Sequence, residues 1–208
     1  MKKAALHNLG CKVNAYETEA MQHLLEEAGY EIVPFTQKAD VYVINTCSVT
    51  NMADRKSRQM LHKAKKNNPD SIVVAAGCYV QTSEKEVLND LSVDIVIGND
   101  RKHDLVRLLE EYSLDSVNDT VDDINDGKHD FEELFIDQTK EHTRAFIKVQ
   151  DGCNQFCSYC IIPYARGRVR SRRFENVIAE VERLAANGFK EVCLLYTSPS
   201  PRDYAASR

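Results

Sequence analysis

The sequence has no apolar run of about twenty residues, the length that a membrane-spanning helix requires, and this argues against a protein built on such helices. It also lacks the apolar leader of a secretory signal peptide. Its seven cysteines are spread across 208 residues, unlike the dense cysteines of a small secreted disulfide scaffold. With a hydrophobic content of 43%, the chain can bury the core of one or two domains. We therefore expect a globular cytoplasmic protein that has no membrane partner and whose cysteines bind metal.

The formal net charge of −5 hides a strong asymmetry along the chain. The segment from Glu110 to Asp137 has eleven acidic residues and one basic residue, Lys128, so its net charge is −10. The segment from Lys140 to Arg173 has a net charge of +6. A local basic segment can hold a polyanion even when the whole chain is acidic.

Short apolar runs alternate with amphipathic stretches over residues 1–112. The apolar runs predict strands at Ala4–Leu9, Glu31–Phe35, Val41–Ile44, Ile72–Ala76 and Ile95–Ile97. Helical spacing recurs over residues 16–28, before Gly29, and over residues 105–112. Strands that alternate with helices predict an α/β domain with a doubly wound parallel sheet, which we place at residues 1–112.

Two different segments follow this predicted domain. Residues 113–139 are rich in acidic residues without sustained periodicity, which predicts a linker or surface excursion with solvated charges. A new βα unit follows over residues 140–194, with strands at Ala145–Val149 and Glu191–Leu195 and a helix between them that ends near Gly188. This unit predicts the truncated start of a (β/α) barrel.

Cys153, Cys157 and Cys160, here called the loop trio, form a Cys-x3-Cys-x2-Cys run directly after the predicted strand. This spacing predicts three thiolates on a cluster of about four irons, so that one iron has no protein ligand and can bind a small molecule. Two alternatives use the same cysteines: a zinc site that adds His142, and a group of redox-active thiols. Zinc sites usually pair two short ligand arms, and no second arm follows Cys160, so the spacing favours the iron-sulfur cluster. The aromatic residue Tyr159 stands before the last cysteine.

Cys11, Cys47 and Cys78, here called the edge trio, each stand just past the end of a predicted strand. The carboxyl ends of parallel strands lie along one edge of a sheet, where ligands bind, so we expect these three thiols to converge. This placement predicts a second three-thiolate cluster. The alternative is that each is a small buried hydrophobe, which is common for free cysteine. Cys193 has no comparable position, and we expect it to pack in a core.

With both trios placed, the residues from Lys2 to about Leu194 resemble the methylthiotransferase family of radical S-adenosylmethionine enzymes. The segments that carry the likeness are Leu9 to Asn14 with Glu17 to Glu19, Asn45 to Thr50, Gly77-Cys78 followed by Gln81, Phe146 to Cys153 and Ile161 to Gly167. Within the family, Lys12-Val13-Asn14 and Asp151-Gly152-Cys153-Asn154 are most similar to the branch that modifies threonylcarbamoyladenosine beside the tRNA anticodon. The alternatives are the branches that modify isopentenyladenosine or a ribosomal protein, which differ from this sequence at these positions.

The resemblance implies two 4Fe–4S clusters, S-adenosylmethionine, tRNA as the substrate, an electron donor such as flavodoxin or ferredoxin, and a sulfur source. The loop trio would hold the cluster that chelates S-adenosylmethionine, with Tyr159 as a cofactor-binding residue. The deoxyadenosyl radical formed there would remove hydrogen from C2 of the target adenine. The cluster on the edge trio would supply or hold the sulfur.

Arginines recur along the segment after the loop trio and are candidates for contacts to RNA phosphates. The candidates are Arg166, Arg168, Arg170, Arg172 and Arg173. The alternatives are that these arginines pair with the acidic linker or bind the carboxylate of S-adenosylmethionine.

Two further expectations concern the class and the extent of the chain. The competing functional class is a binding module that holds an iron-sulfur cluster or zinc without catalysis. Most of the family's barrel and its small basic RNA-binding domain lie beyond Leu194, so we expect the chain as given to be catalytically incomplete. Residues 196–208 carry no helix or strand pattern, and we place a tail of foreign sequence at residues 195–208.

Overall fold

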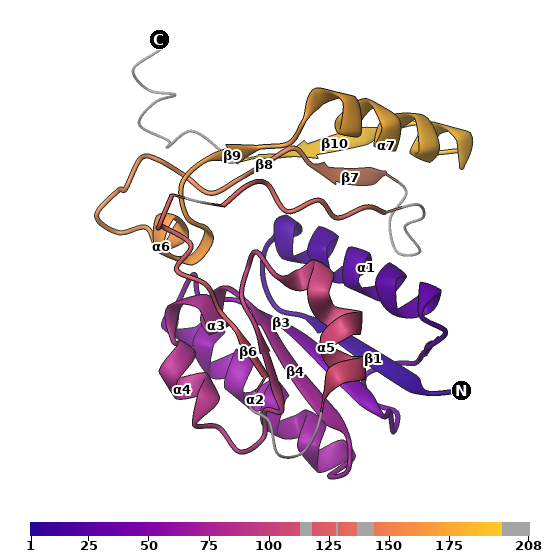
Figure 1. Cartoon of the computed structure of the whole chain (residues 1–208), viewed down its shortest axis with the longest axis vertical. Helices are drawn as coiled ribbons and strands as arrows, with labels where there is room; N and C mark the ends of the chain where they lie inside the picture. The colour runs from indigo at the N-terminus through magenta and orange to yellow at the C-terminus, as the bar shows by residue number, and fades with distance from the viewer. Residues whose placement is uncertain (113–117, 128, 137–143, 197–208) are drawn as a thin grey trace.

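A computed structural model describes residues 1–112, 118–127, 129–136 and 144–196 (Figure 1). Its larger part is a six-stranded parallel sheet in the order β2-β1-β3-β4-β5-β6. The strands are β1 (Lys3–Asn8), β2 (Glu31–Ile32), β3 (Val41–Thr46), β4 (Ile72–Gly77), β5 (Ile95–Ile97) and β6 (Asn118–Thr120). The helices are α1 (Lys12–Glu27), α2 (Asn51–Asn67), α3 (Cys78–Thr82), α4 (Glu84–Leu88), the 3-10 helix η1 (Lys102–Asp104) and α5 (Leu105–Glu111).

The central strand β3 shows why helices cover both faces of this sheet. Tyr42 and Ile44 point to one face and pack in a cluster with residues of α2, α3 and α4. Val41 and Val43 point to the other face and pack with residues of α1 and α5. A strand buried on both faces appears in the sequence as a continuous apolar run. The predicted doubly wound α/β fold is confirmed.

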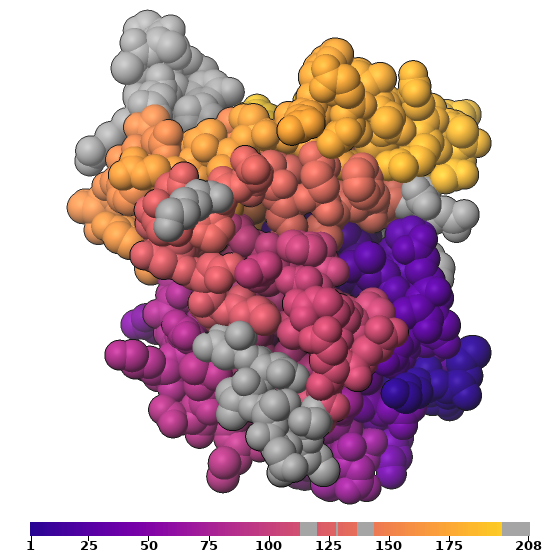
Figure 2. Space-filling model, viewed as in Figure 1, coloured from indigo at the N-terminus to yellow at the C-terminus, as the bar shows by residue number. Residues whose placement is uncertain are grey.

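The second part of the chain packs against one end of the sheet (Figures 1 and 2). It contains β7 (Ala145–Lys148), β8 (Gln150–Asp151), α6 (Ile162–Arg166), β9 (Arg170–Ser171), α7 (Phe174–Ala186) and β10 (Val192–Leu195). Strands β7 and β10 pair in parallel, with Val192 opposite Ala145, and α7 lies between them in the chain. This is the first βα unit of the predicted barrel. Strands β8 and β9 pair antiparallel beside it.

The residues predicted to form a solvated linker take part in the fold. Strand β6 pairs with β5 and extends the sheet. Leu134 and Ile136 are 3% and 1% exposed and pack with Tyr16 of α1 and Phe146 of β7. The prediction of a surface excursion is therefore wrong for these residues, because a three-residue edge strand and isolated buried side chains leave no periodic pattern. Residues 113–117, 128 and 137–143 lie outside the described part of the chain.

Smaller differences from the predicted elements have local causes. Strand β2 ends at Ile32 rather than Phe35, because Pro34 has no N–H to donate to a neighbouring strand. Leu195, predicted to begin a foreign tail, pairs with Lys148 as the last residue of β10. Residues 197–208 of that predicted tail lie outside the described residues. No helix in the described ranges is both long enough and apolar enough to span a bilayer.

Candidate metal centre at the junction of the two parts

The edge trio lies at the carboxyl edge of three adjacent strands. Cys11 follows β1 as the N-cap residue of α1, Cys47 follows β3 directly, and Cys78 begins α3 after β4. Because β1, β3 and β4 are neighbours in the sheet, the topology brings these three loops to one edge. Cys47 and Cys78 are 6% and 3% exposed, whereas Cys11 is exposed.

Two glycines allow these loops to approach one another closely. Gly77 has a φ of +98°, and a Cβ atom there would lie 2.4 Å from Oδ1 of Asn45. A Cβ atom at Gly10, which has a φ of +143°, would lie 3.1 Å from Sγ of Cys47. Any larger residue at either position would be strained and would push the loops apart.

Asn14 connects the Cys11 loop to the end of β3. Sγ of Cys11 donates to Oδ1 of Asn14 (3.3 Å), and Nδ2 of Asn14 donates to the carbonyl oxygen of Thr46 (2.9 Å). Nδ2 of Asn45 donates in return to the carbonyl oxygen of Asn14 (2.9 Å). These bonds hold the first thiol beside the loop that carries Cys47.

The loop trio lies between β8 and α6. Its first member, Cys153, is 8% exposed, and the other two are half-buried. The backbone N–H of Cys153 donates to the carbonyl oxygen of Gly167 (3.0 Å). Gly152 has a φ of +72°, and a Cβ atom there would lie only 2.1 Å from the carbonyl oxygen of Arg168. The chain can therefore enter this loop only with glycine at position 152.

Aromatic rings border the loop trio. Phe156 packs edge-on against Tyr164, with 5.8 Å between the ring centroids, and the guanidinium of Arg168 lies 5.2 Å from the Phe156 centroid. Tyr159, next to Cys160, is 71% exposed. Its ring is therefore accessible to a ligand bound at the loop trio.

The side chains present fit a cluster bound through thiolates. All seven cysteines are free thiols. Burial raises the pKa of the Cys78 thiol, and the charge of Arg166 acts in the opposite direction, so a bound cation is needed to favour the thiolate. Among the described ranges, no group of three or more His, Cys, Asp or Glu side chains is arranged around a single metal ion. His142, the extra ligand of the zinc alternative, lies outside those ranges.

Five buried charged residues, here called the junction cluster, join the two parts of the chain beside both trios. Glu17 of α1 pairs with Arg166 (2.8 Å), Lys148 (2.9 Å) and Lys102 (3.3 Å). Asp151 pairs with Arg166 and Lys148, both at 3.1 Å. The side chains of all five are at most 6% exposed. The cluster therefore joins α1 and η1 of the first part to β7, β8 and α6 of the second.

The cations of the junction cluster control the protonation of its carboxyls. Burial alone raises the pKa of Glu17, but Arg166, Lys102 and Lys148 outweigh burial and hold this pKa well below its ordinary value. Burial likewise raises the pKa of Asp151, and Arg166 and Lys148 outweigh it, so the net shift is downward. Both carboxyls are therefore ionised at neutral pH. Removing one partner leaves a buried charge uncompensated, which is strongly destabilising.

The sequence analysis placed Glu17 and Lys148 only within segments that carry the family likeness, without a role of their own, and it did not single out Lys102. A pattern that would have found Lys148 is present, because a lysine inside the apolar run Ala145–Val149 needs a buried partner. Glu17 stands beside Tyr16 among the buried residues of α1, which is a weaker indication of the same kind. Nothing in the sequence around Lys102 distinguishes it from a surface lysine.

The two parts of the chain match two family models. Residues 3–98 match the model described as Uncharacterized protein family UPF0004, and residues 147–207 match that of the Radical SAM superfamily. The chain is 46% identical over 196 residues to the threonylcarbamoyladenosine tRNA methylthiotransferase MtaB of Bacillus subtilis, covering 93% of this chain and 43% of the relative. It is 44% identical over 200 residues to the protein of that name from Aquifex aeolicus, covering 95% and 48%. A tRNA-2-methylthio-N(6)-dimethylallyladenosine synthase from a Thermoanaerobacter species is 35% identical over 198 residues, covering 91% and 41%.

Both parts of the chain are thus similar to radical S-adenosylmethionine methylthiotransferases. The chain spans less than half the length of these three relatives. The match to the Radical SAM superfamily implies S-adenosylmethionine and a 4Fe–4S cluster. The predicted resemblance to the methylthiotransferases is confirmed.

Two of the arginines predicted to contact RNA are buried. Arg166 and Arg172 are 3% and 6% exposed. Arg172 pairs with Glu180 of α7 and with Glu133 of the acidic segment, and this pair with Glu133 is the contact that the alternative interpretation predicted. Buried against carboxylates, Arg166 and Arg172 have no surface to offer a phosphate, which corrects the prediction for these two residues.

The other three candidate arginines lie nearer the surface. Arg170 pairs with Asp100, and its side chain is 10% exposed. Arg168 and Arg173 are exposed. Contact with RNA therefore stays a prediction chiefly for Arg168 and Arg173.

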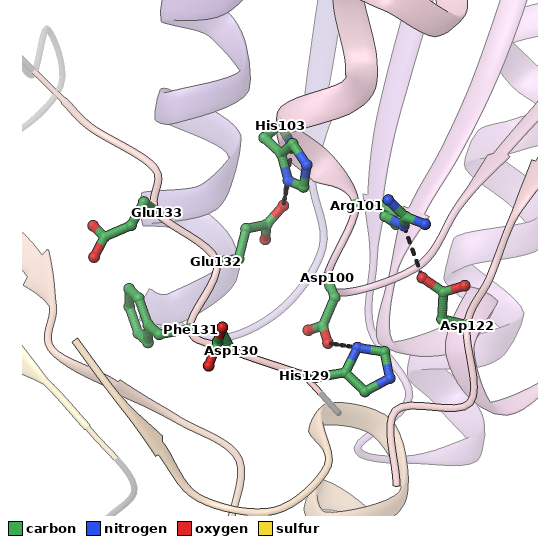
Figure 3. A pocket seen from close by; sticks show the side chains of 9 residues that line it. All are labelled: Asp100, Arg101, His103, Asp122, His129, Asp130, Phe131, Glu132 and Glu133. Atoms are coloured by element: carbon green, nitrogen blue, oxygen red, sulfur yellow. Dashed lines mark hydrogen bonds and ion pairs between the residues drawn. The ribbon is translucent and has the colours of Figure 1, made fainter. Parts of the chain in front are cut away.

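An acidic cavity of about 580 Å³ adjoins the segment predicted to be a linker (Figure 3). Within it His103 interacts with Glu132 (3.2 Å), and His129 interacts with Asp100 (2.9 Å). The hydrogen bond to Glu132 raises the pKa of His103. Carboxylates outnumber basic groups in the lining: Asp100, Asp122, Asp130, Glu132 and Glu133 face Arg101, His103 and His129. Several charges of the acidic segment are thus paired rather than solvated, and the cavity does not suit phosphate groups.

Proposed function

We propose that this chain is part of a cytoplasmic tRNA methylthiotransferase that adds a methylthio group at C2 of N6-threonylcarbamoyladenosine next to the anticodon. The observation that carries the proposal is the position of two cysteine trios beside one buried junction cluster, because sulfur insertion requires both sites. The 46% identity to the Bacillus subtilis relative named for this modified nucleoside supports the choice of substrate.

We assign the S-adenosylmethionine-binding cluster to the loop trio and a second, auxiliary 4Fe–4S cluster to the edge trio. When bound, these groups supply the one-electron cleavage of S-adenosylmethionine and an open iron for the sulfur. The protein holds the loop trio through Gly152 and the hydrogen bond from Cys153 to Gly167. Tyr159 is exposed beside the loop trio and can contact the cofactor there.

The partners follow from this chemistry. The exposed Arg168 and Arg173 are the best-placed candidates to bind tRNA phosphates. An electron donor of the flavodoxin or ferredoxin class and a sulfur source complete the reaction, and a second S-adenosylmethionine supplies the methyl group.

Nucleoside mass spectrometry of tRNA tests this proposal. A deletion strain complemented with the complete gene should regain the 2-methylthio form of threonylcarbamoyladenosine. The Cys47→Ala gene should not restore it, whereas the control Cys193→Ala gene should. Recovery of the methylthio form of dimethylallyladenosine instead would assign the substrate named for the Thermoanaerobacter relative. Product from the Cys47→Ala gene would contradict the auxiliary role, and an iron-loaded protein without any product would indicate a binding module.

A further inference from the structure

The surroundings of the edge trio come from both parts of the chain. Cys78 begins α3, which packs against α6 of the radical part. Nδ2 of Asn99 donates to the carbonyl oxygen of Ala165 in α6 (2.5 Å) and lies 3.7 Å from Sγ of Cys78. The first part alone therefore does not complete the environment of this thiol.

Arg166 brings a positive charge from α6 to the edge trio. Its Nη2 donates to Oδ1 of Asn14 (3.1 Å), the same oxygen that accepts from Sγ of Cys11 (3.3 Å). The residue before Arg166, Ala165, accepts from Nδ2 of Asn99, which lies 3.7 Å from Sγ of Cys78. The guanidinium is thus linked through Asn14 to the first thiol of the edge trio, and the neighbouring backbone of α6 is linked through Asn99 to the third.

Glu17 carries the opposing charge. Both of its carboxylate oxygens accept from Arg166, at 2.8 and 3.1 Å, and its side chain is fully buried. Water screens charges poorly at such a depth, so each of these two groups acts on its surroundings over several ångströms. Removing the charge of Arg166 or of Glu17 changes the electrostatic potential at Cys78 in opposite directions.

We infer that Arg166 is a positioning residue of the auxiliary site, through which the radical part holds the edge trio and sets the electrostatic potential there, with Glu17 as the counter-charge. The inference rests on the proposed function, because it takes the edge trio as cluster ligands. Reduction adds an electron to a cluster, and a buried cation nearby stabilises the added negative charge. Loss of the Arg166 charge should therefore make the cluster harder to reduce, and loss of the Glu17 charge should make it easier.

The test measures the midpoint potential of the auxiliary cluster in the complete protein. Alanine replaces the loop trio (Cys153→Ala, Cys157→Ala and Cys160→Ala), so that only the edge trio binds iron, and the cluster is titrated with dithionite and followed by electron paramagnetic resonance. In this background Arg166→Gln should shift the potential to more negative values, and Arg166→Lys should restore it. Glu17→Gln should shift it to more positive values.

Arg172→Gln is the matched control. Arg172 is also buried and paired with two carboxylates, Glu133 and Glu180, but it is not a member of the junction cluster. This variant should lose stability without a shift in potential. The inference is overturned if Arg166→Gln leaves the midpoint potential of the cluster unchanged, or shifts it no more than Arg172→Gln does. Either result leaves the proposed function standing.

Two further outcomes are decisive. If Arg166→Gln does not fold, the Glu17→Gln shift decides alone: a positive shift supports the inference, and no shift or a negative one overturns it. If the chain without the loop trio binds no iron, the auxiliary site is wrong, and the inference is wrong with it.

Discussion

At the scale of single residues, Tyr16 shows how α1 is joined to the segment before β7 and to α7. Its hydroxyl donates to the carbonyl oxygen of Leu134 (2.6 Å) and lies 3.3 Å from Oε1 of Glu180. Burial, followed by the negative charge of Glu180, raises the pKa of this hydroxyl, so it remains a hydrogen-bond donor at all physiological pH values. Because Tyr16 is only 1% exposed, water cannot replace its hydroxyl as the donor to Leu134.

We expect Tyr16→Phe to lower the free energy of unfolding by about 1–3 kcal/mol, because it leaves the buried carbonyl oxygen of Leu134 with only the longer bond from Arg172 (3.4 Å). Urea denaturation of the variant and the parent chain measures this loss. Tyr164→Phe is the control, since Tyr164 is 57% exposed and should change stability by less than about 0.5 kcal/mol. Equal effects at the two positions would show that the Tyr16 bond contributes nothing.

The sequence predicts the cysteines of the site but not the charges around them. The loop trio is recognised by its spacing over eight residues, 153–160. Glu17 and Lys148 are separated by 131 residues, and only the folded chain brings Oε1 and Nζ within 2.9 Å. The lysine inside an apolar run indicates that Lys148 has some buried partner, but a contact between residues so far apart leaves no local pattern, so the identity of that partner could not be read from one sequence.

At the scale of elements, the entry to the loop trio depends on one glycine. Gly152 directly follows β8 with a φ of +72°, and backbone atoms of Arg168 and Gly167 occupy the space where a side chain would begin. Gly188 follows α7 with a φ of +91°, but a Cβ atom there would meet nothing within 4 Å. An alanine would therefore have a strained backbone at either position, but only at position 152 would its Cβ atom also clash with neighbouring atoms.

We expect Gly152→Ala to destabilise the chain more than Gly188→Ala, whose cost should be confined to backbone strain of about 1–3 kcal/mol. Gly152→Ala should also lose the iron of the loop trio, because the added methyl group displaces the backbone and breaks the hydrogen bond from Cys153 to Gly167. Thermal denaturation and iron analysis of both variants measure the difference. Full iron content in Gly152→Ala would contradict this account of the loop.

The elements that the sequence predicts well are the central ones. Strands β3, β4 and β5 are buried on both faces, so their apolar runs mark them clearly. Strand β6 lies at the sheet edge and has only three residues, and backbone pairing with β5 rather than a side-chain pattern defines it. The acidic composition around β6 therefore suggested a linker where the structure has a strand.

At the scale of the whole molecule, the junction cluster determines how the association of the two parts depends on pH. The folded-state pKa values of Glu17 and Asp151 lie below their ordinary values of 4.5 and 3.8. Their contribution to stability is therefore complete above those values and is lost as the pH falls below them toward the folded-state values. Acid should weaken the junction by protonating its two carboxylates.

We expect Glu17→Gln to destabilise the metal-free chain at neutral pH and to approach the parent chain as the pH falls from 4.5 toward the much lower folded-state pKa of Glu17, at which the folded parent also loses this charge. Thermal unfolding of both chains across this pH range measures the difference. Arg107→Gln, which affects an exposed residue that pairs with Asp104 and Glu111, is the control with little effect. A difference between Glu17→Gln and the parent that does not change with pH would show that Glu17 does not act through its charge.

The most direct test of the central claim, that the two cysteine trios hold two clusters, is the iron and sulfide content of the anaerobically reconstituted chain. We predict about eight irons per parent chain and about four in each variant that has one whole trio replaced by alanine. Cys193→Ala should keep the parent content. The account is contradicted if the parent chain holds only about four irons, and if these are lost when the loop trio is replaced but kept when the edge trio is replaced. A colourless protein that holds zinc would contradict it as well.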